Sequence, residues 1–132
     1  MSWIEIRDMF RGGVAFGAHT RTHPMLPAVT PDRARAEIAG SRTDLEQALD
    51  RPIQFFSYPH GKYSATACAL VEQEGYSGAC TTRTGMNSPA TPVFELRRTE
   101  VRGTDSFLRF ALALWLGDDR LPPRRRQKRA TK

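Results

Sequence analysis

Apolar residues recur along this chain with two alternating spacings, one typical of helices and one typical of short buried strands. Segments with apolar residues three and four positions apart predict four helices, and short apolar segments bounded by turn residues predict four strands. The helices are expected at residues 3–11, 31–49, 65–74 and 107–116, and the strands at residues 14–18, 53–57, 76–82 and 96–101. Helices and strands therefore alternate along the sequence.

Residues that start helices stand where this pattern needs them. Ser2 and Glu5 have the spacing of a capping box, in which each side chain binds the backbone N–H of the other residue. Thr30 followed by Pro31 supplies an N-cap with proline at the first helical position, and Ser106 is the expected N-cap of the last helix. Short-range signals thus mark the predicted helix boundaries.

The order of these elements is typical of an α/β fold with a parallel sheet, because neighbouring parallel strands need a crossover connection. Four strands cannot close a barrel, which takes about eight β/α units and roughly 250 residues. The chain also begins with a helix that should pack against an earlier strand, and no such strand precedes it. We therefore expect a partial (β/α) barrel with parallel strands, covering helices and its N-terminal strands missing.

The composition fits one folded domain without a membrane segment. Of the 132 residues, 39% are hydrophobic and 26% are charged, which is typical of globular domains. No apolar run approaches the ~18 residues that cross a bilayer, and the first residues lack the basic and apolar regions of a signal peptide. The sequence alone assigns no cellular compartment.

The formal net charge of +6 is concentrated at one end of the chain. Residues 118–132 hold seven Lys and Arg and two Asp, a net charge of +5, which leaves +1 for residues 1–117. We therefore expect a nearly neutral domain over residues 1–117 and a basic, solvated tail over residues 118–132. No aromatic residue lies among the basic residues of the tail, so base stacking is not available and nucleic acid is not the expected partner.

Two of the three histidines, His19 and His23, stand four residues apart directly after the first predicted strand. Imidazoles with this spacing reach one metal ion when the residues between them make a single turn, and Pro24 ends such a turn. Reactive groups of parallel α/β folds gather at the C-terminal ends of the strands. Spacing and position predict a divalent-metal site, and a pair of surface histidines without a ligand is the alternative.

The segment His19-Thr20-Arg21-Thr22-His23-Pro24 resembles the His-Ser/Thr-x-x-His-Pro motif of the polysaccharide deacetylases, the NodB-homology group of carbohydrate esterases (family 4-like). Further along, Phe55-Phe56-Ser57-Tyr58-Pro59-His60-Gly61 is similar to the aromatic-x-Tyr-Pro-Tyr-Gly segment of part of that family. The resemblance covers roughly residues 2–116. Two motifs in order at the right separation are far more specific than either motif alone.

The resemblance implies a distorted (β/α) barrel that hydrolyses N-acetyl, or O-acetyl, groups on a polysaccharide or amino sugar at a divalent metal, zinc in the first place. In the family one Asp and two His hold the ion, so His19 and His23 would be the ligands here. Tyr58, Pro59, His60 and Gly61 would form the wall of the groove for the N-acetylated glycan, and a backbone N–H of this loop would bind the developing oxyanion.

The sequence departs from the family pattern in three places. The Thr-Phe-Asp-Asp-Gly segment, which supplies the general base and the third ligand, does not precede His19, where Asp8 is the only aspartate. The late Leu-x-x-His motif that supplies the acid is absent, since no histidine follows His60. His60 itself stands where the family often has tyrosine, either as an exposed turn residue or as an acid or substitute ligand. We therefore expect that hydrolysis by this chain is impaired.

Two other functions remain open at this stage. A non-catalytic fragment or pseudoenzyme would bind carbohydrate or a protein partner without turnover. A nucleic-acid-binding module would act through the basic tail, and its binding would weaken steeply with salt. Relatives of the deacetylase type are often exported or attached to the cell envelope, but the sequence carries no signal that decides the localisation of this chain.

Overall fold

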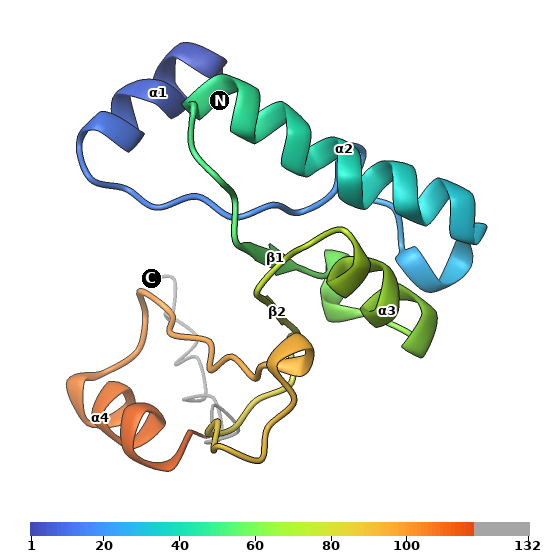
Figure 1. Ribbon diagram of the computed structural model, residues 1–132. Helices are drawn as coiled ribbons and strands as arrows, with labels where there is room; N and C mark the ends of the chain where they lie inside the picture. The colour runs from blue at the N-terminus through green and yellow to red at the C-terminus, as the bar shows by residue number, and fades with distance from the viewer. Residues whose placement is uncertain (118–132) are drawn as a thin grey trace, which may run out of the picture.

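The computed structural model describes residues 1–117, which form four α-helices and a small parallel sheet (Figure 1). The predicted basic tail, residues 118–132, lies outside the described residues. The α-helices are α1 (Trp3–Arg11), α2 (Pro31–Leu49), α3 (Ala65–Gln73) and α4 (Phe107–Leu116), the strands are β1 (Phe55–Ser57) and β2 (Gly78–Cys80), and three short 3-10 helices span Leu26–Ala28, Pro59–Gly61 and Val93–Glu95.

The helices confirm the predicted boundaries, with α3 ending one residue early. The capping box of α1 is formed: the Ser2 amide donates to Glu5 Oε2 at 2.6 Å, and the Glu5 amide donates to Ser2 Oγ at 3.3 Å. Thr30 and Ser106 cap α2 and α4 through their hydroxyl oxygens. These boundaries were predictable because each N-cap bond joins residues three positions apart.

The strands are shorter than the sequence pattern predicted. β1 pairs in parallel with β2 over three residues each, with Phe55 opposite Gly78 and Ser57 opposite Cys80. The predicted strands at residues 14–18 and 96–101 shrink to single parallel bridges, Ala18 with Phe56 and Leu96 with Cys80. The sheet order is therefore Ala18, β1, β2, Leu96, all parallel and in chain order.

Competing hydrogen bonds explain why the two outer strands are shorter than predicted. The Val14 amide donates to the Met9 carbonyl at 3.0 Å, which ties the start of the first predicted strand to the end of α1. At the other edge, the Arg97 amide and carbonyl both bind the side-chain amide of Asn87, at 2.9 and 3.0 Å. Backbone groups satisfied in this way have no need of a ladder partner.

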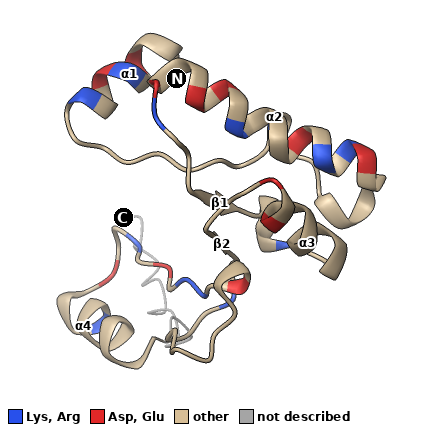
Figure 2. Cartoon of the chain, viewed as in Figure 1, with Lys and Arg blue, Asp and Glu red and all other residues tan. Residues whose placement is uncertain are grey.

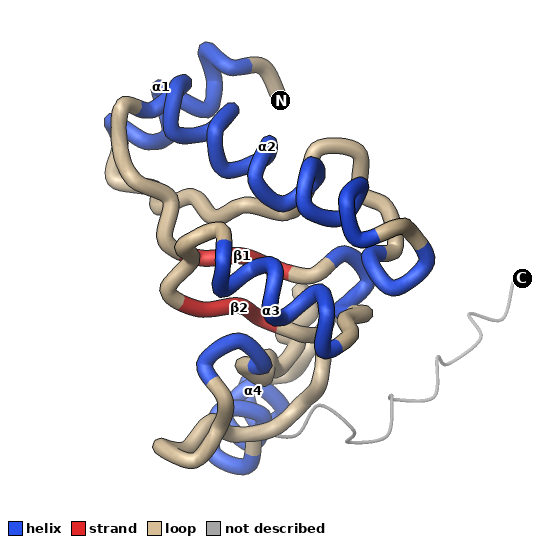
Figure 3. The backbone as a smooth tube through the Cα atoms, turned by 45° about the vertical axis from the view of Figure 1, so that its right-hand side comes forward, coloured by secondary structure: helices blue, strands red, loops and turns tan. Residues whose placement is uncertain are grey.

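Helices cover one face of this sheet. α2 crosses between Ala18 and β1, α3 crosses between β1 and β2, and the two helices contact each other beside the sheet (Figure 1, Figure 3). Phe56 points into their core and is 1% exposed, whereas its neighbour Phe55 points to the opposite face and is 53% exposed. The fold is thus α/β with parallel strands, as predicted, and closure into a partial barrel stays a prediction.

The core depends largely on α2, whose charged residues are spread along the ribbon (Figure 2). Its buried side includes Ala34, Ile38 and Leu49, which join Phe56 and Val71 in one cluster. One charged residue, Glu37, is buried among these apolar positions at 7% exposure. Since a buried carboxylate needs hydrogen-bond donors, this residue points to a specific polar contact.

The last helix differs from its sequence pattern. The apolar positions of α4 predict a buried face, yet Phe107 is 84% exposed and Trp115 is 80% exposed, and Ala113 is the helix residue that is buried. The described residues therefore present an apolar surface along α4. No helix in the described part of the chain combines the length and the apolar character that a bilayer crossing requires.

Replacing the most central residue of α2 should destabilise the whole fold. Ile38 is fully buried, so Ile38→Ala is expected to lower the free energy of unfolding by about 2–5 kcal/mol. Urea denaturation followed by circular dichroism measures this loss. Ile4→Ala is the matched control, because Ile4 is exposed and its truncation should change stability by less than about 0.5 kcal/mol. Equal losses in the two variants would contradict the assigned core.

Tyr76 should make stability fall at high pH. Its hydroxyl donates to the Ile38 carbonyl at 3.0 Å, and burial raises its pKa from 10 to about 12. Because the folded pKa is the higher one, this contribution is complete below pH 10 and is lost as the pH rises towards 12. Tyr76→Phe should lower stability by about 1 kcal/mol at pH 8 and decline less steeply from pH 10 to 12. Urea titrations at each pH measure both effects, and parallel profiles would contradict the assignment.

Candidate functional site

The three histidines of the chain meet at the C-terminal ends of the parallel strands. His19 follows the Ala18 bridge, His23 lies one turn later, and His60 lies in the Pro59–Gly61 helix after β1. The Nε2 atoms of His19 and His23 are 3.1 Å apart, and the ring of His60 packs edge-on against His23 with centroids 4.5 Å apart. The structure thus brings His19 and His23 together as the motif predicted, and it adds His60.

One hydrogen bond selects the tautomer of a neutral His19 ring. Its Nδ1 atom lies 2.6 Å from the carbonyl oxygen of Ser57, the last residue of β1. A carbonyl oxygen only accepts hydrogen bonds, so Nδ1 carries the proton and the Nε2 of the neutral ring keeps its lone pair. That lone pair faces His23. Metal-binding histidines characteristically donate their other ring N–H to such an acceptor.

The backbone of the site is held in an uncommon conformation. Four non-glycine residues of the described chain have positive φ, and three of them are Thr20 (64°), His23 (57°) and His60 (55°). The Thr20 hydroxyl donates to the His19 carbonyl at 2.5 Å and accepts the His23 amide at 3.1 Å, which closes the turn locally. Left-handed residues persist where their surroundings over-determine them, and they cluster at functional sites.

Two carboxylates of helix α2, Glu37 and Asp44, bind the segment between His19 and His23, and the sequence pattern did not predict this role. Glu37 accepts the backbone amides of Arg21 and Thr22 at 2.9 and 2.8 Å and the Thr22 hydroxyl at 2.5 Å. Burial alone would raise the pKa of Glu37, but these hydrogen bonds outweigh it and hold the pKa below its usual value. A charge flanked by Ala34 and Ile38 on the inner side of the predicted helix was the signal that could have found it.

The second carboxylate is Asp44. Its two oxygens pair with Arg21 Nε and Nη2 at 2.7 and 2.6 Å, and this pairing lowers the pKa of Asp44. The guanidinium lies across Gly40, where a Cβ atom would approach it to 2.5 Å. A side chain at position 40 would therefore displace Arg21 from α2.

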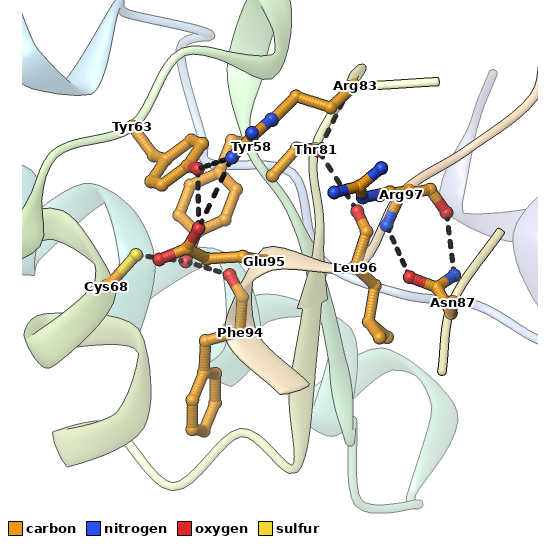
Figure 4. Close-up of polar contacts among 10 residues, drawn as sticks. All are labelled: Tyr58, Tyr63, Cys68, Thr81, Arg83, Asn87, Phe94, Glu95, Leu96 and Arg97. Atoms are coloured by element: carbon orange, nitrogen blue, oxygen red, sulfur yellow. Dashed lines mark hydrogen bonds and ion pairs between the residues drawn. The ribbon is translucent and has the colours of Figure 1, made fainter. Parts of the chain in front are cut away.

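The structure corrects the role expected for the side chain of Tyr58. This ring is fully buried, stacks on Tyr63 with centroids 5.2 Å apart, and donates its hydroxyl to the Phe94 carbonyl at 3.0 Å (Figure 4). Burial raises the pKa of Tyr58 far above its usual value, so the hydroxyl stays protonated. The side chain of Tyr58 is therefore part of the core and not of a groove wall.

Of the four residues expected to line a groove, His60 is the exposed one, since Pro59 and Gly61 are buried as well. Gly61 has φ +64°, and a Cβ at this position would lie 2.0 Å from Thr82 Oγ1, so the loop fits closely against the end of β2 only with glycine. Tyr58 and Gly61 donate their amides within the fold, and proline has none. The amide of His60 is the remaining candidate donor of this loop.

The 3.1 Å distance between the two Nε2 atoms is that of a hydrogen bond between the rings, and it is also close to the separation of two ligands of one ion. Two nitrogens at about 2.0–2.1 Å from a tetrahedral zinc ion would be about 3.3–3.4 Å apart, close to the observed 3.1 Å. Within residues 1–117, however, no group of three His, Cys, Asp or Glu residues is arranged to hold an ion. Among the described residues, His19 and His23 are thus two candidate ligands of one metal ion.

These features define a parallel α/β protein with paired histidines at the ends of its strands. The family model for polysaccharide deacetylases matches residues 1–79, more than half of the sequence, and the chain therefore belongs to the polysaccharide deacetylase family. This result confirms the resemblance found in the two sequence motifs.

Individual relatives agree with this assignment. YxkH of Bacillus subtilis (strain 168), which carries the name of a polysaccharide deacetylase, is 27% identical over 97 residues, covering 74% of this chain and 35% of YxkH. The structure is similar to BC0361, a polysaccharide deacetylase from Bacillus cereus, with a TM-score of 0.78 and 25% identity over 86% of this chain and 36% of that chain. It is also similar to the Streptococcus pyogenes deacetylase PplD in complex with acetate, with a TM-score of 0.72 and 28% identity over 74% of this chain and 43% of that chain. The chain thus spans less than half the length of each of these relatives.

The proton of His19 should be found on Nδ1. Long-range ¹H–¹⁵N correlation spectra of the metal-free chain, recorded at a pH where the rings are uncharged, report which ring nitrogen carries the proton. We expect a protonated Nδ1 and an unprotonated Nε2 for His19, because the Ser57 carbonyl is an obligate acceptor. A His19 ring protonated on Nε2 would contradict the orientation described here.

Proposed function

We propose that this chain takes part in the metal-assisted hydrolysis of acetyl groups, N-acetyl in the first place, on a polysaccharide or amino sugar. His19 and His23 would hold a divalent ion of the zinc type. The observation that carries the proposal is the 3.1 Å approach of the two Nε2 atoms, with the lone pair of His19 directed at His23. Family membership supports the choice of an acetylated carbohydrate as substrate.

A bound divalent ion supplies polarisation of the acetyl carbonyl and lowers the pKa of a water molecule. The protein groups have separate tasks around it. The Ser57 carbonyl keeps Nδ1 of His19 protonated, so the lone pair of Nε2 is free to bind the ion. The amide of His60 donates to the oxygen on which negative charge develops, because it is the N–H of the Tyr58–Gly61 loop that remains for this task.

The surface next to this loop offers room for a sugar. A hollow of about 340 Å³ is lined by Thr82, Arg98, Thr99 and Glu100. Thr82 also contacts the backbone of Gly61, so the hollow adjoins the loop that carries His60. Hydroxyl, guanidinium and carboxylate groups of this kind bind the hydroxyls and amides of a carbohydrate by hydrogen bonds.

A second candidate function is carbohydrate binding without turnover. Catalytic zinc sites commonly have three protein ligands, and the described residues place two beside each other. Two ligands hold an ion more weakly, and hydrolysis also needs a base for the attacking water. The rate expected for this chain is therefore low, and binding at the same surface is the function that would remain.

Zinc-dependent release of acetate tests the proposal. We expect slow release from an N-acetylated chitooligosaccharide that requires added zinc, stops with a chelator and disappears in His19→Ala, because that variant loses a metal ligand. Acetate is measured enzymatically, and thermal unfolding of His19→Ala verifies that the variant is folded.

A folded chain that releases no acetate at any zinc concentration would rule out hydrolysis by this chain. Retention of the same oligosaccharide, measured by calorimetry, would then favour the binding function. Release that persists unchanged in His19→Ala would contradict the metal centre instead.

A further inference from the structure

We infer that Glu37 is a positioning residue for the histidine turn, residues 19–23: its buried carboxylate fixes the backbone conformation that directs His23 at His19. The inference rests on the proposed metal centre. It concerns a residue of α2 that lies outside both sequence motifs and does not itself contact a histidine ring in any hydrogen bond found in the described chain.

The contacts of Glu37 are concentrated on the middle of the turn. One carboxylate accepts three hydrogen bonds from two consecutive residues, the amides of Arg21 and Thr22 and the hydroxyl of Thr22. Both amides must therefore point to the same side of the chain. Consecutive amides converge on one acceptor only in a tightly curved backbone.

The curvature induced in this way explains the unusual backbone on either side. Thr20 and His23, which flank the anchored pair, both have left-handed φ values of 64° and 57°. Neither is glycine, so local preference opposes this conformation and the surroundings must maintain it. Without the carboxylate, the amides of Arg21 and Thr22 lose their acceptor on α2, and the Thr20 hydroxyl is left as the contact that constrains His23.

The chemistry of the contact requires a hydrogen-bond acceptor, and an ionised carboxylate offers only acceptors. Both amides donate to the same oxygen, Oε2, so the carbonyl oxygen of a glutamine could still accept them. Methionine is close to glutamate in length and offers only a weakly accepting sulfur, so Glu37→Met removes the contact. Glu37 is also 7% exposed, so water has little access to replace a lost bond, in contrast to the more exposed Arg21–Asp44 pair.

The same helix provides a matched control. Glu46 is a second carboxylate of α2 that accepts a backbone amide from a loop, that of Ile53 at 3.0 Å, together with Arg42 Nε at 2.8 Å. It anchors the segment that enters β1 and makes none of the contacts to the histidine turn. Glu46→Met therefore tests the loss of an anchoring carboxylate on α2 without disturbing residues 20–23.

The test compares metal affinity in the full chain. Zinc affinity is measured by competition with a chromophoric chelator, and cobalt(II) absorption reports the coordination geometry. We expect Glu37→Met to weaken zinc binding about 10- to 100-fold and to alter the cobalt spectrum, as is typical when a residue that orients metal ligands is replaced. Glu46→Met should keep the affinity within about twofold, since its contacts lie elsewhere.

The outcomes separate this inference from the function on which it rests. If the unsubstituted chain shows no saturable zinc binding, the metal centre and the inference both fail. If it binds zinc and Glu37→Met binds equally well, the inference alone fails.

A second pair of variants covers the case in which Glu37→Met does not fold. Thr22→Val removes the hydroxyl bond and leaves both amide bonds to Glu37, so zinc affinity should fall by a smaller factor, and Thr22→Ser should restore it. Equal zinc affinity in Thr22→Val and Thr22→Ser would overturn the inference.

Discussion

The parallel register between Ala18 and β1 is the constraint on which the site depends. The Ala18 amide donates to the Phe55 carbonyl, and the Ser57 amide donates to the Ala18 carbonyl, both at 2.9 Å. This register places His19 beside Ser57, whose carbonyl then orients the imidazole. A slip of one residue would turn His19 to the opposite face of the sheet, because side chains alternate along an extended segment. Two backbone hydrogen bonds thus decide where the first histidine points.

Helix α2 connects the stability of the fold with the geometry of the site. Ile38 fills the core beneath the sheet, and the adjacent Glu37 binds the histidine turn. The loop after β1 is set differently, by close contact of Gly61 with Thr82 and by the buried ring of Tyr58. The histidines are therefore carried by two short loops, each fixed by a different set of buried contacts.

The sequence predicted those features that depend on near neighbours in the chain. Helix boundaries follow from caps such as Ser2 and Thr30, and the convergence of His19 and His23 follows from their spacing after a strand. The outer strands were predicted too long because the Asn87 side chain and the Met9 carbonyl at the end of α1 bind backbone groups of those segments, and the apolar pattern does not indicate such bonds. The burial of Tyr58 and the packing of His60 on His23 likewise depend on residues far apart in the sequence. The parallel α/β class was correct because regular alternation of elements leaves few alternatives.

The adjacency of Glu37 and Ile38 has a mechanical consequence. If Ile38 shifts in the core, the carboxylate of Glu37 moves with it, because the helical backbone moves as a stiff unit. A substitution that lets α2 settle into a smaller core volume would therefore pull on the histidine loop, although no residue of that loop had changed. Substitutions in the core and the geometry of the histidine loop are therefore coupled in this chain, because a single peptide bond joins Ile38 to Glu37.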